Sequence, residues 1–196
     1  FRKYGARRAL RGAYRTRARN TGQGYVKPPK NLKQNSGEKS VMVACAIGDG
    51  KVLMWHVVPD RWNADSAADM YSGPLRRCLQ KAYPDVTRNW RVLEDNDPRG
   101  YKSGKAKDAK YDAGISSFDL PRRSPDMNPL DFSLWSEVNR RMRKQERDWP
   151  KSKRETRAGF VERLRKTAMS LPREYIEKII GAIAGRCQQL VDAKGY

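Results

Sequence analysis

The stretch VLEDNDPRG (residues 92–100) places two carboxylates, Asp95 and Asp97, at the end of the short apolar run WRVLE (90–94). Aromatic and β-branched residues in such a run indicate a buried strand. Pro98 and the glycine that follows it indicate a turn. A carboxylate at a strand end is held in a fixed place, where it can either ligate a metal ion or cap the next helix.

The charge of the chain points to a polyanionic partner. The chain has 196 residues, enough for one domain with an appendage, and its formal net charge is +20. So large a charge repels itself, and phosphate backbones are the usual partners that neutralise it. An acidic membrane surface is the weaker alternative, since no amphipathic segment has a strongly apolar face. No run approaches the roughly 18 apolar residues of a membrane span.

The cysteines and the histidine predict no metal site of their own. Cys45, Cys78 and Cys187 are widely spaced in apolar contexts, which is typical of reduced thiols in an intracellular protein. The single histidine, His56, lies within the strand-like run VLMWHVV and is interpreted as structural.

Residues 1–24 contain eight basic residues and no acid, and four glycines interrupt them. This pattern predicts a basic arm, either disordered or ordered by a partner, although it also resembles an organelle transit peptide. We divide the chain into the arm with its Pro/Lys-rich connector (1–39), a core (40–147) and a C-terminal helical extension (148–196). The candidate nucleic-acid-binding residues of the first part are Arg2, Arg7, Arg8, Arg11, Arg15, Arg17, Arg19, Lys27 and Lys30.

The core pattern predicts an α/β fold with a mixed sheet. Two valine-rich runs around Gly48-Asp49-Gly50 indicate a β-hairpin. A helix follows, with Asn63 as its N-cap and Pro74 splitting it. The remaining predicted elements are the WRVLE strand, a polar helix ending at Gly114, a strand over 115–120, and helices over 130–147, 155–170 and 173–191.

Asp131 is a second acid that can lie close to Asp95. Asp131 follows the turn SPDMNP (124–129) and lies at the start of an amphipathic helix. Strand ends and helix starts can bring side chains together, as a magnesium site with few carboxylates requires.

Two segments carry a family resemblance. EDNDPRGYKS (94–103) and LPRRSPDMNPLDFSLWSEVNRRM (120–142) resemble the second and third acidic motifs of Tc1/mariner-type transposases, which have an RNase H-like fold and belong to the DDE/D superfamily. YVKPP (25–29) and SVMVACAI (40–47) are similar to family segments between the first and second acids. The likeness runs from about Tyr25 to Arg143.

The resemblance implies a role for each acid. Asp95 corresponds to the second catalytic acid and Asp131 to the third, and both would bind magnesium or manganese in an active enzyme. Asp97 and Asp126 would be structural, with Asp97-Pro98 starting the next helix and Asp126 capping its turn.

The resemblance also implies a first acid on a central strand, before YVKPP. Nothing acidic precedes Glu38, and Asp49 in the hairpin turn is a poor substitute. We therefore expect an RNase H-like sheet that is incomplete at the N-terminus, with unpaired edges on the hairpin and on the WRVLE strand. The strand could precede this sequence, come from another chain, or be lost in a domesticated protein.

Three functions remain open at this point. The first is a non-catalytic, transposase-derived nucleic-acid binder without a cofactor, such as a ribosomal component, with RNA favoured over DNA and other proteins as partners. The second is an active Tc1/mariner-like transposase that uses magnesium or manganese. The third is a basic protein scaffold. The expected location is intracellular, in an organelle such as the mitochondrion or in the nucleus.

The segment NRRMRKQERDWPKSKRETR (139–157) is strongly basic. It indicates either an exposed helix face with pairs such as Glu137–Arg141, or a phosphate-binding ridge. The ridge residues would be Arg140, Arg141, Arg143, Lys144, Lys151, Lys153 and Arg154.

Overall fold

The computed structural model describes residues 41–59, 61–86, 89–121, 124–150 and 155–193. The part from Met42 onward forms one compact unit. The predicted arm and connector, together with Lys151, Lys153 and Arg154 of the predicted ridge, lie outside the described residues.

The predicted hairpin is confirmed. β1 (Met42–Gly48) pairs with β2 (Lys51–Val58) in antiparallel orientation, with a register shift between Ala46 and Ile47. The turn residues Asp49 and Gly50 have φ values of 48° and 67°. Two consecutive left-handed residues give a two-residue hairpin turn whose twist matches that of the strands.

The predicted helix after the hairpin is also confirmed, including its cap and its break. Asn63 and Ser66 form a capping box, in which each side chain accepts the backbone N–H of the other. Pro74 cannot donate a backbone hydrogen bond, and the helix accommodates it in a π-turn. The helix therefore consists of α2 (Ala64–Met70), the π-turn η1 (Tyr71–Leu75) and α3 (Arg76–Ala82).

The second strand pair is a parallel unit. β3 (Trp90–Glu94) leads through α4 (Gly104–Ala113) to β4 (Ile115–Asp119), and β3 and β4 pair in parallel. Gly114 ends α4 in the left-handed conformation at φ 71°, as predicted. Within the described residues no ladder joins β1–β2 to β3–β4, and the expected open edges stay a prediction.

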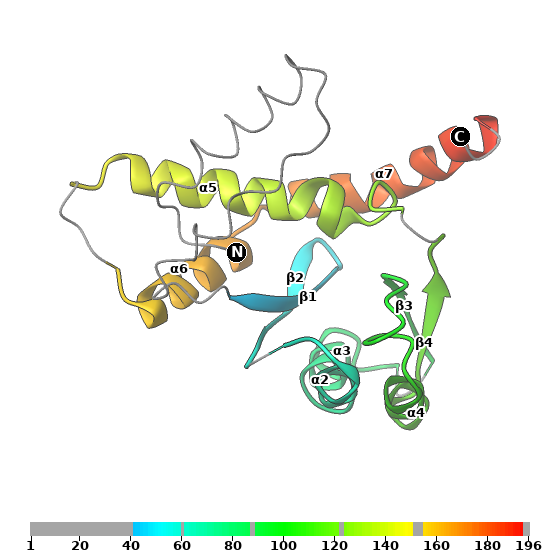
Figure 1. Cartoon of the computed structure of the whole chain (residues 1–196). Coiled ribbons are helices and arrows are strands. Elements are labelled where there is room, and N and C mark those ends of the chain that lie inside the picture. The colour runs from blue at the N-terminus through cyan, green and yellow to red at the C-terminus, as the bar shows by residue number, and fades with distance from the viewer. Residues whose placement is uncertain (1–40, 60, 87–88, 122–123, 151–154, 194–196) are drawn as a thin grey trace, which may run out of the picture. The chain divides into compact units, whose positions relative to one another are not determined.

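The C-terminal part is helical. It contains the π-turn η2 (Leu130–Leu134), α5 (Trp135–Arg147), α6 (Arg157–Met169) and α7 (Arg173–Asp192) (Figure 1). Leu134, Val138, Leu164 and Ile176 are fully buried, and α5 packs against α6. Of the predicted apolar face of Leu134, Trp135, Val138 and Met142, Trp135 is half-buried and the other three are buried.

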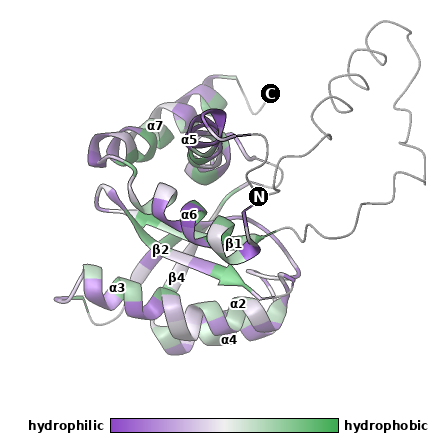
Figure 2. Ribbon diagram, turned by 90° about the vertical axis from the view of Figure 1, so that its left-hand side faces the viewer, coloured by the Kyte–Doolittle hydropathy of each residue, from purple (hydrophilic) through white to green (hydrophobic). Residues whose placement is uncertain are grey.

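Helices cover the strands from both sides (Figure 2). α2, α3 and α4 lie on one side, and α5, α6 and α7 lie on the other. One continuous apolar cluster joins residues of both strand pairs, such as Met54 and Trp90, to Met70 and Ala106 of the first helical layer. This helical layer therefore holds both strand pairs. None of the described helices is long and apolar enough to cross a membrane.

The three cysteines form no disulfide, as predicted. Burial raises the pKa of the Cys45 thiol to about 12.

Candidate active site

Asp95 stands at the end of β3, where the sequence predicts it. Its side chain is exposed, and its Oδ1 accepts the backbone N–H of Asn96 at 2.8 Å. The Asn96 side chain donates to the backbone oxygen of Leu120, just after β4, at 3.4 Å. The carboxyl ends of both parallel strands are thereby linked next to Asp95.

Asp131 is held by the first residues of its helix. It is the second residue of η2, and the Asn128 amide nitrogen donates to its Oδ2 at 3.0 Å. Asn128 also accepts the N–H of Leu130 through Oδ1 at 3.1 Å, so it orients the acid and caps the turn. The Trp135 side chain donates a further hydrogen bond to Asp131. Helical π-turns are frequent at functional sites, because they re-aim side chains.

The two acids lie close enough to influence one another. Partial burial, and then the negative charge of Asp95, raise the pKa of Asp131 above its ordinary value. Burial, and then the charges of Glu94, Asp95, Asp97 and Asp131, raise the pKa of Tyr101, so this side chain is within the field of both acids. The fold therefore brings Asp95 and Asp131 together, with Tyr101 beside them.

Asp97 is structural, but it does not start the helix. Its carboxylate accepts the backbone N–H groups of Arg99 and Gly100 at 3.1 and 3.0 Å, which closes a turn. The helix begins later, at Gly104, with Ser103 as its N-cap. The predicted helix start at Asp97-Pro98 is wrong because Asp97 uses its oxygens on the turn.

Asp126 also has a different role from the predicted one. Its side chain is exposed, and its backbone oxygen accepts a hydrogen bond from Arg186 at 3.0 Å. The Asn128 side chain, and not that of Asp126, accepts a backbone N–H at this turn, from Leu130 at 3.1 Å. The N-P dipeptide after a turn was the available sequence signal for Asn128.

Gly100 sits against an indole ring. A Cβ at this position would lie 1.9 Å from Nε1 of Trp62, so only glycine fits. The Trp62 ring also contacts Tyr101, with ring centroids 4.7 Å apart. This close packing fixes the turn that joins Asp95 to α4.

A buried ionic cluster lies directly behind Asp95. Glu94 and Lys110 are 8% and 5% exposed, and the Lys110 ammonium donates to Glu94 Oε1 at 2.5 Å. The Tyr71 hydroxyl donates to Glu94 Oε2, and Lys102 lies 3.6 Å from Oε1. Burial and the Glu94 charge raise the pKa of Tyr71. The sequence interpretation missed this cluster, whose only signal was an acid within an apolar strand.

The acid pair has two carboxylates, and the described residues contain no group of three or more possible metal-ligating side chains. Asp49 pairs with Lys51 at 3.2 Å and with Arg173 at 3.6 Å in the hairpin turn. Carboxylates open to solvent fit a hard divalent cation such as Mg²⁺ or Mn²⁺ in donor type. Asp95 and Asp131 can therefore supply part of such a site.

The predicted basic ridge contains ion pairs. Glu137 accepts from Arg140 at 2.6 and 2.8 Å and from Arg141 at 2.7 Å. The hydrogen bonds from these two guanidinium groups hold the pKa of Glu137 at about 2. The helix-face alternative therefore describes these two arginines, and Arg143 and Lys144 are exposed on the same helix. Phosphate binding by this segment stays a prediction.

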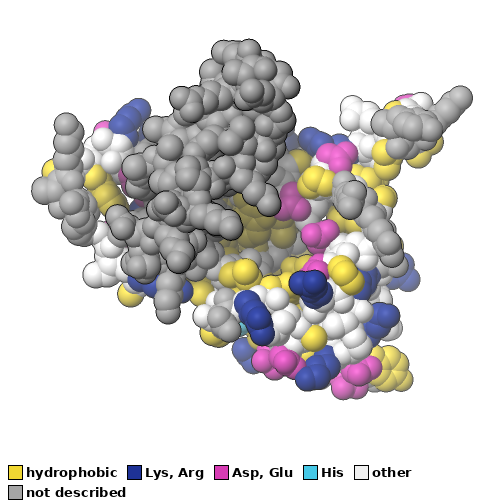
Figure 3. Space-filling view, viewed as in Figure 1, with side chains coloured by type: hydrophobic (Ala, Val, Ile, Leu, Met, Phe, Trp, Pro, Cys, Tyr) yellow, Lys and Arg dark blue, Asp and Glu magenta, His cyan; other side chains and the backbone are white. Residues whose placement is uncertain are grey.

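Basic and acidic side chains are interspersed around α2 and α4, in the lower part of Figure 3. One such pair is Lys105–Asp65 at 2.5 Å. This face of the described unit is therefore not a patch of one sign.

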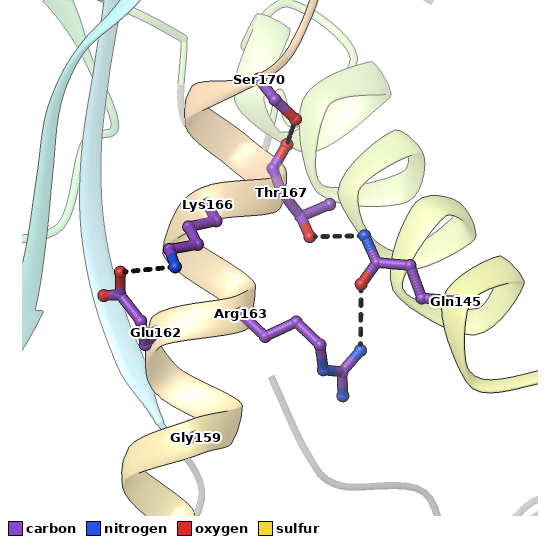
Figure 4. Close-up of a pocket in the computed structure, with 7 residues that line it drawn as sticks. All are labelled: Gln145, Gly159, Glu162, Arg163, Lys166, Thr167 and Ser170. Atoms are coloured by element: carbon purple, nitrogen blue, oxygen red, sulfur yellow. Dashed lines mark hydrogen bonds and ion pairs between the residues drawn. The ribbon is translucent and has the colours of Figure 1, made fainter. Parts of the chain in front are cut away.

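A groove of about 500 Å³ lies between α5 and α6 (Figure 4). Its cations are paired, since Arg163 contacts Glu146 and Glu155, and Lys166 contacts Glu162. Gln145 of the groove is about 20 Å along the helix from Asp131, at 1.5 Å per residue. The groove is therefore separate from the acid pair.

The fold matches that of solved transposase catalytic domains. The Mos1 transposase catalytic domain with raltegravir and manganese superposes with a TM-score of 0.67 at 18% identity, covering 80% of this chain and 76% of that one. The Mos1 mariner paired-end complex with manganese gives a TM-score of 0.69 at 17% identity, over 88% of this chain and 50% of that one.

Sequence comparison gives the more particular assignment. The Tcb1 transposase of Caenorhabditis briggsae is 26% identical over 168 residues, which are 76% of this chain and 54% of the relative. The Tc1 transposase of Caenorhabditis elegans is 30% identical over 118 residues, which are 59% of this chain and 39% of the relative. The chain resembles the catalytic domain of Tc1/mariner transposases in both sequence and fold. No family model matches it.

The share of each relative that is matched limits what these similarities say about the present chain. The chain spans about half the length of the Tcb1 and Tcb2 transposases it matches. The Mos1 structures include a complex with a left transposon end and a strand transfer complex. The predicted preference for RNA and the predicted ribosomal role have no support among these similarities.

Proposed function

We propose that this chain is a DNA-binding, transposase-type core in which Asp95 and Asp131 supply two ligands of a divalent metal site. The proximity of these two carboxylates carries the proposal: after partial burial, the negative charge of Asp95 is the next largest cause that raises the pKa of Asp131. A strand end and a helical π-turn place the acids, as pre-organised metal ligands require.

The residues around the pair have distinct tasks. Asn128 and Trp135 orient Asp131 through hydrogen bonds. Tyr101 is half-buried, and the charges of both acids act on its hydroxyl. A divalent metal bound there would lower the pKa of an attacking water and stabilise charge at a phosphodiester. Two carboxylates match the +2 charge of one divalent ion but supply only two of its six or more ligand positions, so we expect weak binding and no strand cleavage by the pair without a third ligand.

Asparagine at either acid should weaken Mn²⁺ binding by about tenfold or more, because each replacement removes a charged ligand while keeping its shape. Electron paramagnetic resonance of free Mn²⁺ would measure the affinity of wild type, Asp95→Asn and Asp131→Asn. Asp112→Asn and Asp126→Asn are charge-matched controls, since each removes one exposed carboxylate outside the pair. Equal losses in all four variants would mean diffuse attraction and not a site.

Duplex DNA should displace a labelled probe from the protein more effectively than single-stranded RNA of equal length. Affinity should fall steeply with salt, because a chain of net charge +20 releases counterions from phosphates. Competition fluorescence anisotropy at two salt concentrations measures both effects. A preference for RNA would overturn the DNA assignment and favour the non-catalytic ribonucleoprotein role.

Nicking of supercoiled DNA separates catalysis from binding. Metal-dependent cuts that disappear in Asp95→Ala would show that the pair acts in cleavage without a third ligand from the described residues. The proposal expects binding without such cuts.

A further inference from the structure

α7 lies across the segment that carries Asp131 and contacts it at three points. The Arg186 guanidinium donates through Nη1 to the backbone oxygen of Asp126 at 3.0 Å. The same guanidinium carbon stacks over the Phe132 ring, 3.8 Å from its centroid. The Tyr175 hydroxyl lies 2.8 Å from Ser133 Oγ. These contacts hold both residues that follow Asp131, and the turn before it.

The contacts come from one face of α7. Tyr175 and Arg186 are 11 positions apart, which is about three helical turns and roughly 16 Å. Ile176 and Ile179 between them are 0% and 4% exposed, so the core anchors this part of the helix. Tyr175 and Arg186 are thus presented together by a helix that is itself fixed.

The Asp131 segment needs such support. Asp131 is exposed, and the N–H groups of Asp131 and Phe132 both donate to the Asn128 backbone oxygen, at 2.9 and 3.0 Å. One carbonyl therefore supports two amides in a short π-turn, without a long regular helix on its N-terminal side. The Arg186 guanidinium donates to the Asp126 carbonyl before the turn and stacks on the Phe132 ring within it. Arg186 therefore contacts this segment on both sides of Asp131.

We propose that Arg186 is a positioning residue, which fixes the Asp131 turn in the geometry that the acid pair requires. This inference rests on the proposed function for its link to metal binding, while the restraint on the turn can be measured without metal. Arg186 acts through the backbone and through Phe132, and it donates no hydrogen bond to Asp131 among the contacts of the described residues.

Electrostatics alone would give the opposite result. Arg186 is a cation in contact with Phe132, the residue after Asp131, so removal of its charge can only leave unchanged or strengthen the attraction of a second cation. A loss of Mn²⁺ affinity in Arg186→Ala therefore identifies positioning, and a gain identifies simple repulsion. Arg186→Lys keeps the charge but loses the planar fork that both donates and stacks.

Hydrogen exchange of the metal-free protein tests the restraint first. In Arg186→Ala the amides of Asp131 and Phe132 should exchange about tenfold faster, while those of β2 should keep their rates and report intact folding. Lys178→Ala is the matched control, because it removes one exposed cation from the same helix. Unchanged exchange at Asp131 and Phe132 would overturn the inference.

Mn²⁺ titration then tests the consequence. Arg186→Ala and Arg186→Lys should both bind about tenfold more weakly than wild type, and Lys178→Ala should match wild type. Wild-type affinity or tighter binding in Arg186→Ala would overturn the positioning role. A wild-type protein that binds no Mn²⁺ would overturn the proposed function instead, and the exchange rates would still decide whether Arg186 holds the turn.

Discussion

Replacement of Glu94 with alanine should lower the free energy of unfolding by about 3–5 kcal/mol, the usual result of removing one partner from a buried ion pair. Glu94 accepts from the Lys110 ammonium and the Tyr71 hydroxyl, and all three side chains are buried. Without the carboxylate, a buried charge and a buried hydroxyl lose their partner. Urea denaturation followed by circular dichroism measures the change.

Two further variants identify the cause. Glu94→Leu combined with Lys110→Met removes both charges and should recover most of the loss, since apolar residues of similar volume replace the pair. Asp65→Ala breaks the Lys105 pair, whose side chains are both 67% exposed, and should change stability far less. A loss of under about 1 kcal/mol in Glu94→Ala would show that the cluster contributes little to stability.

Replacement of Leu134 with alanine should destabilise the fold by about 2–5 kcal/mol. Leu134 is 0% exposed at the last position of η2, where it joins the Asp131 turn to the helical core. The truncation leaves a cavity in a close-packed interior, which the surrounding side chains cannot fill without moving. Thermal and urea unfolding would give the magnitude.

Leu134→Met is the matched control for this position. It conserves volume and apolar character, so it should cost less than about 1.5 kcal/mol. If Leu134→Ala were as stable as Leu134→Met, the interior at the end of η2 would be loosely packed, and burial of Leu134 would not fix the acid-bearing turn.

Local signals account for most of what the sequence predicted. Asn63, Pro74 and Gly114 act through their own backbone neighbours, so the cap, the break and the helix end could be placed without a structure. The hairpin followed from its two-residue turn in the same way. Asp97 was harder, because both a turn and a helix start use the same side-chain oxygens.

Contacts between distant segments could not be predicted in this way. The pairing of Glu94 with Tyr71 and Lys110 depends on how α4 and η1 meet behind β3. The contact of Arg186 with the Asp131 turn joins positions 60 residues apart. The acids themselves were identified by resemblance to a family, and the fold then brought Asp95 and Asp131 together.

The sequence distances within the described unit set an order of assembly. The hairpin closes over two turn residues, and β3 reaches β4 through a single helix, so these contacts cost little loop entropy. The contact of α7 with the turn before Asp131 closes a loop of 60 residues. Chains form such distant contacts more slowly than local ones. We therefore expect the turn before Asp131 to reach its final geometry late in folding, after the β1–β2 and β3–β4 pairs have formed.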